Sequence, residues 1–259
     1  MKIIVCINQV PDSAASVFVE DGLVTWHDAP LVVNPWDEFA IEAALVQREN
    51  CGGEITALSI GPESAKEALK YSLAMGCNTA VLISNPAPNY FDEQITARIL
   101  AAAILKIGEA GVVIMGRQAI DTDMGTTAAQ VARILGWPAL TLASAIHLVD
   151  TEAGSIQIER AFEEGRQVLE SQIPVVISVV KDIGEPRYPS FMGIRNAQKA
   201  SIPIWSLADL GLTTIEPAVN CVELMEPPQQ KVSTEMITGQ SPQEIAEILV
   251  KKISAEKII

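Results

Sequence analysis

A polar loop near the middle of the chain carries residue types that can bind an anion. It follows an apolar run at residues 111–115 and leads at once into a helix-periodic run at 128–135. The loop residues are Gly116, Arg117, Gln118, Ala119, Ile120, Asp121, Thr122, Asp123, Met124, Gly125, Thr126 and Thr127. Free backbone N–H groups and the positive end of the helix dipole would face one point, and threonine hydroxyls add donors. The sequence therefore predicts an anion site around residues 125–127.

This loop does not carry either of two common phosphate-binding signatures. It has neither the Walker pattern Gly-x4-Gly-Lys-Ser/Thr nor the Gly-x-Gly-x-x-Gly pattern of dinucleotide-binding folds. A strand that passes through a loop onto a helix is also an ordinary structural connection. The particular residues of the loop, rather than its general form, make it informative.

Four phrases of the chain together resemble the β subunit of the electron transfer flavoproteins. Residues 116–121 are similar to the phrase Gly-Arg/Lys-Gln-Ala-Ile-Asp of that family's adenine-nucleotide loop. Residues 34–42, 73–77 and 185–190 are similar to its phrases Asn-Pro-x-Asp/Cys-Glu-x-Ala-x-Glu, Leu-Ala-Met-Gly-Ala and Glu-Pro-Arg-Tyr. The phrases stand in the family's order. The resemblance covers essentially the whole chain and is weakest over residues 10–30 and beyond about 215.

The resemblance implies a nucleotide site built from several segments. Besides the loop 116–127, the positions that match the family's contacts to AMP are Cys6, Asn34, Pro35, Trp36, Asp37 and Ile60. Many family members carry Asn-Gln-Thr or Ala-Gln-Val where this chain has residues 125–127, so a side-chain amide is lost while backbone donors and hydroxyls remain. Asp121 and Asp123 would repel a phosphate, and we expect them to cap backbone amides or to face a subunit interface.

The resemblance also implies a docking surface for a partner dehydrogenase. In the family, the region matching residues 186–197 is a recognition loop whose exposed leucine enters a pocket of that enzyme. The residues assigned to docking here are Tyr188, Phe191, Met192 and Ile194. Phe191 stands at the position of the leucine, and we expect Pro186 and Pro189 to stiffen the loop and Gly193 to let it turn away. The alternative is that Phe191 packs into the chain's own core or under the α subunit.

The composition favours an aliphatic core and excludes some partners. Hydrophobic residues make up 49 % of the 259 residues and aromatic residues only 5 %, which suits a parallel sheet covered by helices. The net charge of −14 argues against nucleic acid and anionic membranes as partners. No run approaches the ~20 apolar residues of a membrane span, and no signal peptide is evident. We expect a cytoplasmic location.

Metal-binding and catalytic patterns are not found in the sequence. The cysteines and histidines are Cys6, Cys51, Cys77, Cys221, His27 and His147, without Cys-x-x-Cys spacing. Free thiols and no metal site are expected. The chain also lacks the Gly-x-Ser-x-Gly elbow of hydrolases. We expect an electron-carrier subunit with no catalytic residues of its own.

Alternating patterns over the first 200 residues predict an α/β fold, mainly a parallel sheet with helices on both faces (Rossmann-like, adenine-nucleotide-hydrolase-like). Strands are expected at residues 2–7, 55–60, 80–83 and 112–115, with helices at 34–50, 62–75, 91–107 and 128–135 and a loop at 85–89. Asn34 is expected to cap the first helix. Segments at 146–149, 155–160 and 167–171 predict an antiparallel hairpin insertion before a buried strand at 173–180.

The end of the chain differs in character. Residues 201–240 are rich in proline and irregular, and a helix is expected only at 242–253. A long irregular stretch inside a compact domain would be unusual, so we expect it to lie on another chain. The predicted division is a nucleotide-binding domain at 1–200 and a C-terminal arm and helix at 201–259 that pack on a partner subunit.

These inferences predict a β subunit of a heterodimeric electron transfer flavoprotein. It would bind an adenine nucleotide, pair with an α subunit that carries the electron-accepting FAD, and pass electrons between an acyl-CoA or other dehydrogenase and an acceptor. AMP or a second FAD could fill its own site. A second FAD, with NADH as donor, is typical of the electron-bifurcating branch of the family. Two segments, residues 205–210 and 257–259, resemble the tails of that branch and of nitrogen-fixation-linked homologues.

Two predictions from other classes stay open at this level. An ATP-dependent adenylating enzyme would need a Ser-Gly-Gly-x-Asp-Ser loop after the first strand, where residues 8–13 stand instead. A stand-alone nucleotide-binding regulatory protein is usually a homodimer of about half this length, and the long C-terminal arm argues against it.

Overall fold

The computed structural model describes residues 1–84, 92–150, 152–212, 216–219, 221–226 and 234–256. The loop predicted at 85–89, the helix start predicted at 91 and the tail at 257–259 lie outside these residues. The described chain groups into two compact units, Met1–Leu224 and Met225–Ile259. Each is described by itself.

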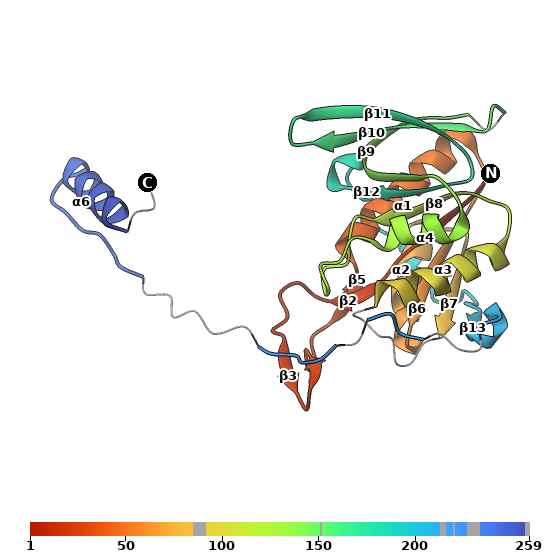
Figure 1. The fold of residues 1–259 in the computed structure, drawn as a ribbon, viewed down its shortest axis with the longest axis horizontal. Helices are drawn as coiled ribbons and strands as arrows, with labels where there is room; N and C mark the ends of the chain where they lie inside the picture. The colour runs from red at the N-terminus through yellow and green to blue at the C-terminus, as the bar shows by residue number, and fades with distance from the viewer. Residues whose placement is uncertain (85–91, 151, 213–215, 220, 227–233, 257–259) are drawn as a thin grey trace. The chain divides into compact units, whose positions relative to one another are not determined.

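A mixed sheet forms the centre of the first unit (Figure 1). Within the described residues it has nine strands in the order β11-β10-β9-β12-β8-β1-β6-β7-β13. The strands are β1 (Lys2–Cys6), β6 (Glu54–Gly61), β7 (Thr79–Ser84), β8 (Ala110–Gly116), β9 (Ala139–Asp150), β10 (Ser155–Phe162), β11 (Gly165–Gln172), β12 (Val175–Val179) and β13 (Ile204–Trp205). From β9 to β13 in this order, neighbouring strands run parallel.

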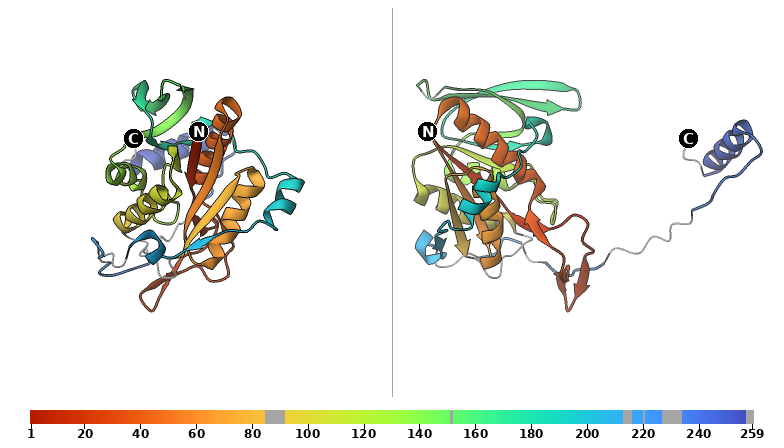
Figure 2. Two further views of the ribbon diagram at one scale, coloured as in Figure 1. Left: turned by 90° about the vertical axis from the view of Figure 1, so that its right-hand side faces the viewer. Right: turned by 180° about the vertical axis from the view of Figure 1, so that it is seen from behind.

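Helices cover both faces of this sheet. They are α1 (Pro35–Cys51), α2 (Lys66–Met75), α3 (Glu93–Ile107), α4 (Thr127–Leu135) and α5 (Phe191–Ala197). Alternate side chains of β1 point to opposite faces. Ile3 and Val5 join a core with α1 and α2, whereas Ile4 and Cys6 join a core with α3 and α4. Figure 2 shows these helix pairs on the two sides of the strands. The predicted α/β fold is confirmed.

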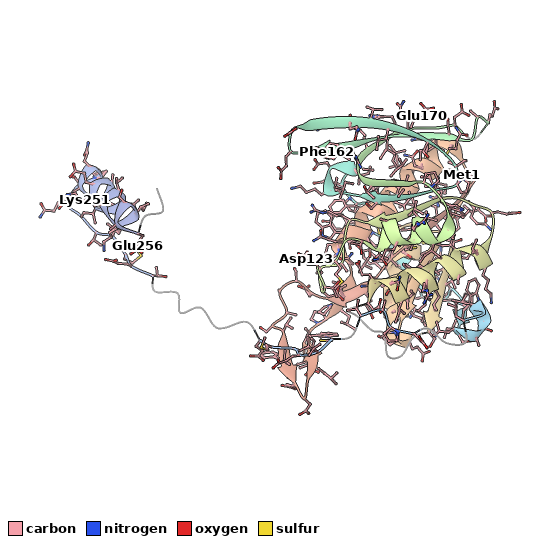
Figure 3. The ribbon with its side chains drawn as sticks, viewed as in Figure 1. Met1, Asp123, Phe162, Glu170, Lys251 and Glu256 are labelled. Carbon is pink, nitrogen blue, oxygen red and sulfur yellow. The ribbon has the colours of Figure 1, made fainter. Side chains whose placement is uncertain are left out.

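Two smaller additions complete the first unit. Strand β10 pairs antiparallel with β9 and with β11, so the predicted hairpin insertion extends one edge of the main sheet. Phe162, labelled in Figure 3, is the last residue of β10, and the Arg160 guanidinium lies 4.4 Å from its ring centre. Between β1 and α1 lie the ladders β2–β5 and β3–β4, formed by β2 (Gln9–Pro11), β3 (Phe18–Glu20), β4 (Leu23–Thr25) and β5 (Leu31–Val33).

Part of the predicted C-terminal arm belongs to the first unit. Strand β13 pairs with β7, and Lys106 of α3 donates to the Asp209 carbonyl at 2.6 Å. The buried carboxylate of Asp92 accepts from Gln94 and Ile95 at the start of α3, and from the backbone of Ala218 and Val219. Burial alone would raise the pKa of Asp92, but these four amides hold it below its ordinary value. The contact boundary therefore lies near residue 224 rather than 200.

The second unit contains one helix, α6 (Pro242–Ala255), among its described residues. Ser241 accepts from the Glu244 amide, and the Glu244 carboxylate accepts from the Gln240 amide, which caps the first turn from both sides. Its apolar stripe includes Ile245, Ile248 and Leu249, and the helix buries none of its residues. That this helix packs on a partner subunit stays a prediction.

Candidate functional site

The most favourable place for a ligand lies where the strand order of the sheet reverses. After β1 the chain adds β6 and then β7 on one side, and it then crosses back to place β8 on the other side of β1. In open α/β sheets, ligands bind in the crevice at the carboxyl ends of the strands at such a reversal. The carboxyl ends of β1 and β8 lead here to Asn8 and to the loop 116–127.

Asp37 joins the two strands at this point. It lies in the first turn of α1 and is only 6 % exposed. Its carboxylate accepts from the Asn8 amide at 2.8 Å and from the Gly116 amide at 3.0 Å. Gly116 has no room for a side chain, because a Cβ would come within 2.6 Å of the Trp36 carbonyl carbon. The start of α1 is therefore packed directly against the start of the loop.

Asn34 fastens the same helix start to the middle of the loop. Its side-chain nitrogen donates to the Gln118 carbonyl at 2.8 Å, and its side-chain oxygen accepts from the Ile120 amide at 3.2 Å. Asn34 occupies the N-cap position of α1, but its side chain makes no capping hydrogen bond to the amides of the first turn. The predicted cap position is confirmed, but the Asn34 side chain binds the loop instead of the helix amides. Pro35 at the first helical position has no N–H group and so leaves no amide unpaired there.

The loop is further closed by contacts of its own. The Asp123 amide donates to the Ala119 carbonyl at 2.9 Å, and the Asp123 carboxylate accepts from the Gln118 side-chain amide. Asp123, labelled in Figure 3, therefore binds a side-chain amide rather than capping a backbone amide. The Arg117 guanidinium lies 5.7 Å from the centre of the Trp36 ring. These contacts restrict the conformation of the loop.

Two adjacent cavities, of about 110 and 160 Å³, open beside this loop. They share the wall residues Asn8, Ile60, Ala119 and Thr127, and the two together are called the groove below. The groove has apolar walls with a few polar groups, as small-molecule sites commonly have. Wall residues that the sequence did not single out include Ile7, Leu100, Met115 and Ala128 of the first cavity and Trp26, Leu31, Pro62 and Thr96 of the second.

Most of the predicted nucleotide-site residues come together in this groove. Those that line the first cavity are Cys6, Asn34, Asp37, Ile60, Gly116, Arg117, Gln118, Ala119, Met124, Gly125 and Thr127. Asp121 and Thr122 line the second, whereas Pro35, Trp36, Ile120, Asp123 and Thr126 line neither. Burial raises the pKa of the Cys6 thiol, so this side chain is a neutral wall group. That a nucleotide contacts these residues stays a prediction.

Glu93 occupies the predicted anion position at the start of α4. The Thr126 amide donates to its carboxylate at 3.2 Å, the Thr127 hydroxyl donates at 3.0 Å, and the Thr126 hydroxyl also contacts it. The donors therefore fit an anionic group, because a carboxylate of the chain itself already sits on them. Glu93 is not among the residues that the sequence patterns predicted for this site. Its position after β7 gave a signal, since α3 must begin at the same edge of the sheet as the loop.

Three of the predicted docking residues, Phe191, Met192 and Ile194, lie on the short helix α5 rather than at a loop tip, and Tyr188 lies just before it. Ser190 caps α5, and its hydroxyl accepts from the Gly193 amide at 2.9 Å. Tyr188 is 92 % and Phe191 81 % exposed, with Met192 and Ile194 also exposed. Phe191 therefore does not pack in the core of the described chain. Gly193 does not serve as a turn; it lets α5 approach the Ala74 carbonyl of α2, where a Cβ would clash.

Arg187 fixes the approach to these side chains. Its backbone amide donates to Glu42 at 3.0 Å, and its guanidinium donates to the carboxylates of Glu42 and Glu49, at 2.8 and 2.6 Å for the shortest contacts. Both acids belong to α1. A fork of this kind restricts orientation as well as distance. Tyr188 and α5 are thus presented from a segment that is locked to the same helix as the groove.

The described residues include no helix long and apolar enough to cross a membrane. Over the same residues, no group of three or more His, Cys, Asp or Glu side chains could hold a metal ion. The four cysteines are free. The fold and the groove define an α/β, Rossmann-like protein with a ligand-sized groove where the strand order of its sheet reverses.

Comparisons with known proteins identify the family. A model of the electron transfer flavoprotein domain matches residues 21–210. The chain is 37 % identical to the caffeyl-CoA reductase-Etf complex subunit CarD of Acetobacterium woodii and 32 % identical to the electron transfer flavoprotein subunit beta of Clostridium acetobutylicum, each over 100 % of both chains. It is 38 % identical to the protein FixA of Azorhizobium caulinodans over 83 % of this chain and 78 % of that one.

The chain therefore belongs to the electron transfer flavoprotein family, among its β subunits and their CarD and FixA relatives. The resemblance inferred from the four phrases is confirmed.

Asp37 generates a prediction about pH. Burial raises its pKa to about 7, because the two amides, Asn34 and the other groups offset only part of the lost hydration. The folded protein then holds this proton more tightly than the unfolded chain does. Its stabilising contribution is complete below an ordinary value near 3.8 and is lost as the pH rises through 7, a difference on the order of 2–4 kcal/mol.

Carbon-detected NMR of the Asp37 carboxyl group should show a midpoint near 7. The free energy of unfolding of Asp37→Asn should lack the corresponding decline between pH 4 and 7. A carboxyl midpoint at or below 4 would show that the amides dominate and that this prediction is wrong.

Proposed function

We propose that this chain is the β subunit of a heterodimeric electron transfer flavoprotein, which binds an adenine nucleotide in the groove beside the loop 116–127. Together with an α subunit that carries FAD, it would pass electrons between a dehydrogenase and an acceptor. The observation that carries the proposal is the set of donors of Thr126 and Thr127, which bind an anion beside an apolar cavity at the reversal of the sheet.

The residues of the groove fit the part that AMP and FAD share. Both contain an adenosine 5′-phosphate, which needs an apolar slot for the base and donors for the phosphate. Ile60, Leu100 and Met115 supply apolar wall, and the start of α4 supplies the donors. When bound, FAD in the partner subunit supplies the redox chemistry. The residues of this chain would position the adenine nucleotide and hold the loop against α1.

A second candidate is the electron-bifurcating form, with a second FAD in the groove and NADH as the donor. The observation that supports this form is the similarity over the whole chain to a subunit of a caffeyl-CoA reductase-Etf complex. Acid extraction of the purified complex followed by chromatography separates the two candidates, because one releases AMP and the other a second FAD per heterodimer.

The first prediction concerns the α subunit. Co-expression with the α subunit should yield a flavin-containing complex of one copy each, whereas the chain alone should be poorly soluble or bind flavin weakly. Leu249 lies on the apolar stripe of α6, so Leu249→Asp should lower recovery of the α subunit about tenfold by burying an unpaired charge. Lys251→Asp, two positions away on the exposed side of α6, is the control. A fully flavinated, monodisperse single chain would contradict the heterodimer.

A second prediction tests the phosphate position. Gly125 lines the groove one residue before the Thr126 donor. Gly125→Asp would place a carboxylate against a phosphate, and loss of one or two charge-assisted hydrogen bonds costs on the order of 2–4 kcal/mol of binding. Nucleotide content of the purified complex should fall accordingly. Gly125→Ala is the control, since its Cβ would meet the Arg117 carbonyl oxygen at 3.0 Å in the same way without the charge. Unchanged nucleotide content in Gly125→Asp would refute the placement.

A third prediction tests docking. Phe191 is exposed on α5 beside Met192, and a large apolar side chain that enters a partner's pocket often carries much of the binding energy of a small interface. Phe191→Ala should lower electron transfer from the dehydrogenase by roughly tenfold or more, with flavin content and melting temperature nearly unchanged. Leu105→Ala is the control, because Leu105 is an exposed apolar residue on α3. If Phe191→Ala instead loses flavin while its transfer rate stays intact, the docking assignment is wrong.

A further inference from the structure

Glu93 is the first residue of α3, and its carboxylate lies on the donors at the start of another helix, α4. A glutamate at a helix start is ordinarily explained by the dipole of its own helix. Here the side chain reaches across to the Thr126 amide and to both threonine hydroxyls. These are the donors that the proposed function assigns to the phosphate of the nucleotide.

The hydroxyl of Thr126 is already oriented toward an anion. Its oxygen accepts from the Gln130 side-chain nitrogen at 2.8 Å, so its proton points to the Glu93 carboxylate. The Thr127 hydroxyl donates to the other carboxylate oxygen at 3.0 Å. A phosphate that uses the same three donors would bring a second negative charge next to the first. Two anions at such a separation repel strongly in a partly buried site, so both cannot occupy the donors.

We propose that Glu93 is an intramolecular competitor, which fills the phosphate position of the groove until an adenine nucleotide displaces it. This inference rests on the proposed function and adds a specificity-determining residue to that site. The tethered carboxylate keeps the site closed for a fraction of the time, so it weakens the apparent affinity for phosphate-bearing ligands by that fraction. It leaves the apolar part of the groove open.

The surroundings of Glu93 allow its side chain to move without its backbone. The neighbouring Asp92 caps α3 and also binds the amides of Ala218 and Val219, which fixes the main chain at this point. Only rotation about the side-chain bonds of Glu93 is needed to free the donors. The displaced carboxylate stays at the start of α3, where the dipole of that helix still stabilises it. Release therefore needs no movement of the main chain and is reversible.

Titration of the purified complex with the α subunit, after its bound nucleotide has been removed, with AMP and, separately, with adenosine tests the proposal. In Glu93→Gln the charge is lost, and AMP should bind roughly tenfold tighter than to the wild type while adenosine affinity changes less than about twofold. In Glu93→Asp the charge is kept but the side chain is one methylene shorter. It should fall short of the Thr127 hydroxyl and show a similar gain for AMP.

Glu109→Gln is the matched control. It removes the same charge at an exposed position at the opposite end of β8, and its affinity for AMP should equal that of the wild type. A gain in Glu109→Gln equal to that in Glu93→Gln would mean that net charge alone acts, and it would overturn the proposal. Without AMP, Glu93→Gln should also melt at a lower temperature than the wild type, because the helix start loses its anion.

The outcomes distinguish a failure of the proposal about Glu93 from a failure of the proposed function. If the wild type binds AMP and Glu93→Gln and Glu93→Asp bind it equally or more weakly, the groove is a nucleotide site and Glu93 supports it rather than competes. The proposal about Glu93 is then wrong, and the proposed function stands. If AMP and adenosine bind neither the wild type nor any variant at millimolar concentration, the nucleotide assignment of the groove fails, and the competitor role fails with it.

Discussion

The first unit depends most on the attachment of the start of α1 to the ends of two parallel strands. Asp37 binds the amides after β1 and at the end of β8, and Asn34 binds the loop two and four residues further on. Backbone amides at strand ends have no ladder partner, so a buried carboxylate that accepts from both satisfies them together. The cost is a carboxyl group that is partly desolvated. This single helix turn decides where the loop lies and how wide the groove is.

The same helix connects the groove to the exposed apolar surface on α5. Glu42 and Glu49, one and three turns further along α1, hold Arg187, and the segment after Arg187 carries Tyr188 and Phe191. On the other side, α5 packs through Gly193 on the end of α2. Three of the four phrases that suggested the family thus contact one another, and the fourth, residues 73–77, contacts α5, which follows the phrase at 185–190. Each phrase supplies one side of a contact between segments that lie far apart in the sequence.

Periodicity and local chemistry were enough to predict much of this molecule. The alternating strands and helices, the hairpin insertion and α6 follow from apolar patterns whose period is a property of the backbone. Nine of the twelve loop residues assigned to the nucleotide line the groove, because strands in a parallel sheet bring their carboxyl ends to one edge. The side chain of Asn34 was misjudged, since an asparagine before a proline satisfies the cap pattern whether or not its side chain turns to the helix.

The sequence by itself determined the class of fold, the family and the position of the loop before α4. Only the tertiary structure decided what each polar side chain binds. Glu93 at the anion position, Asp92 on the backbone of residues 218 and 219, and Arg187 on α1 each join positions more than thirty residues apart in the chain. A local sequence pattern does not predict such distant partners. They are set by how α1, α3 and α4 pack on the sheet, because side-chain hydrogen bonds act over about 3 Å and depend on the final placement of both groups.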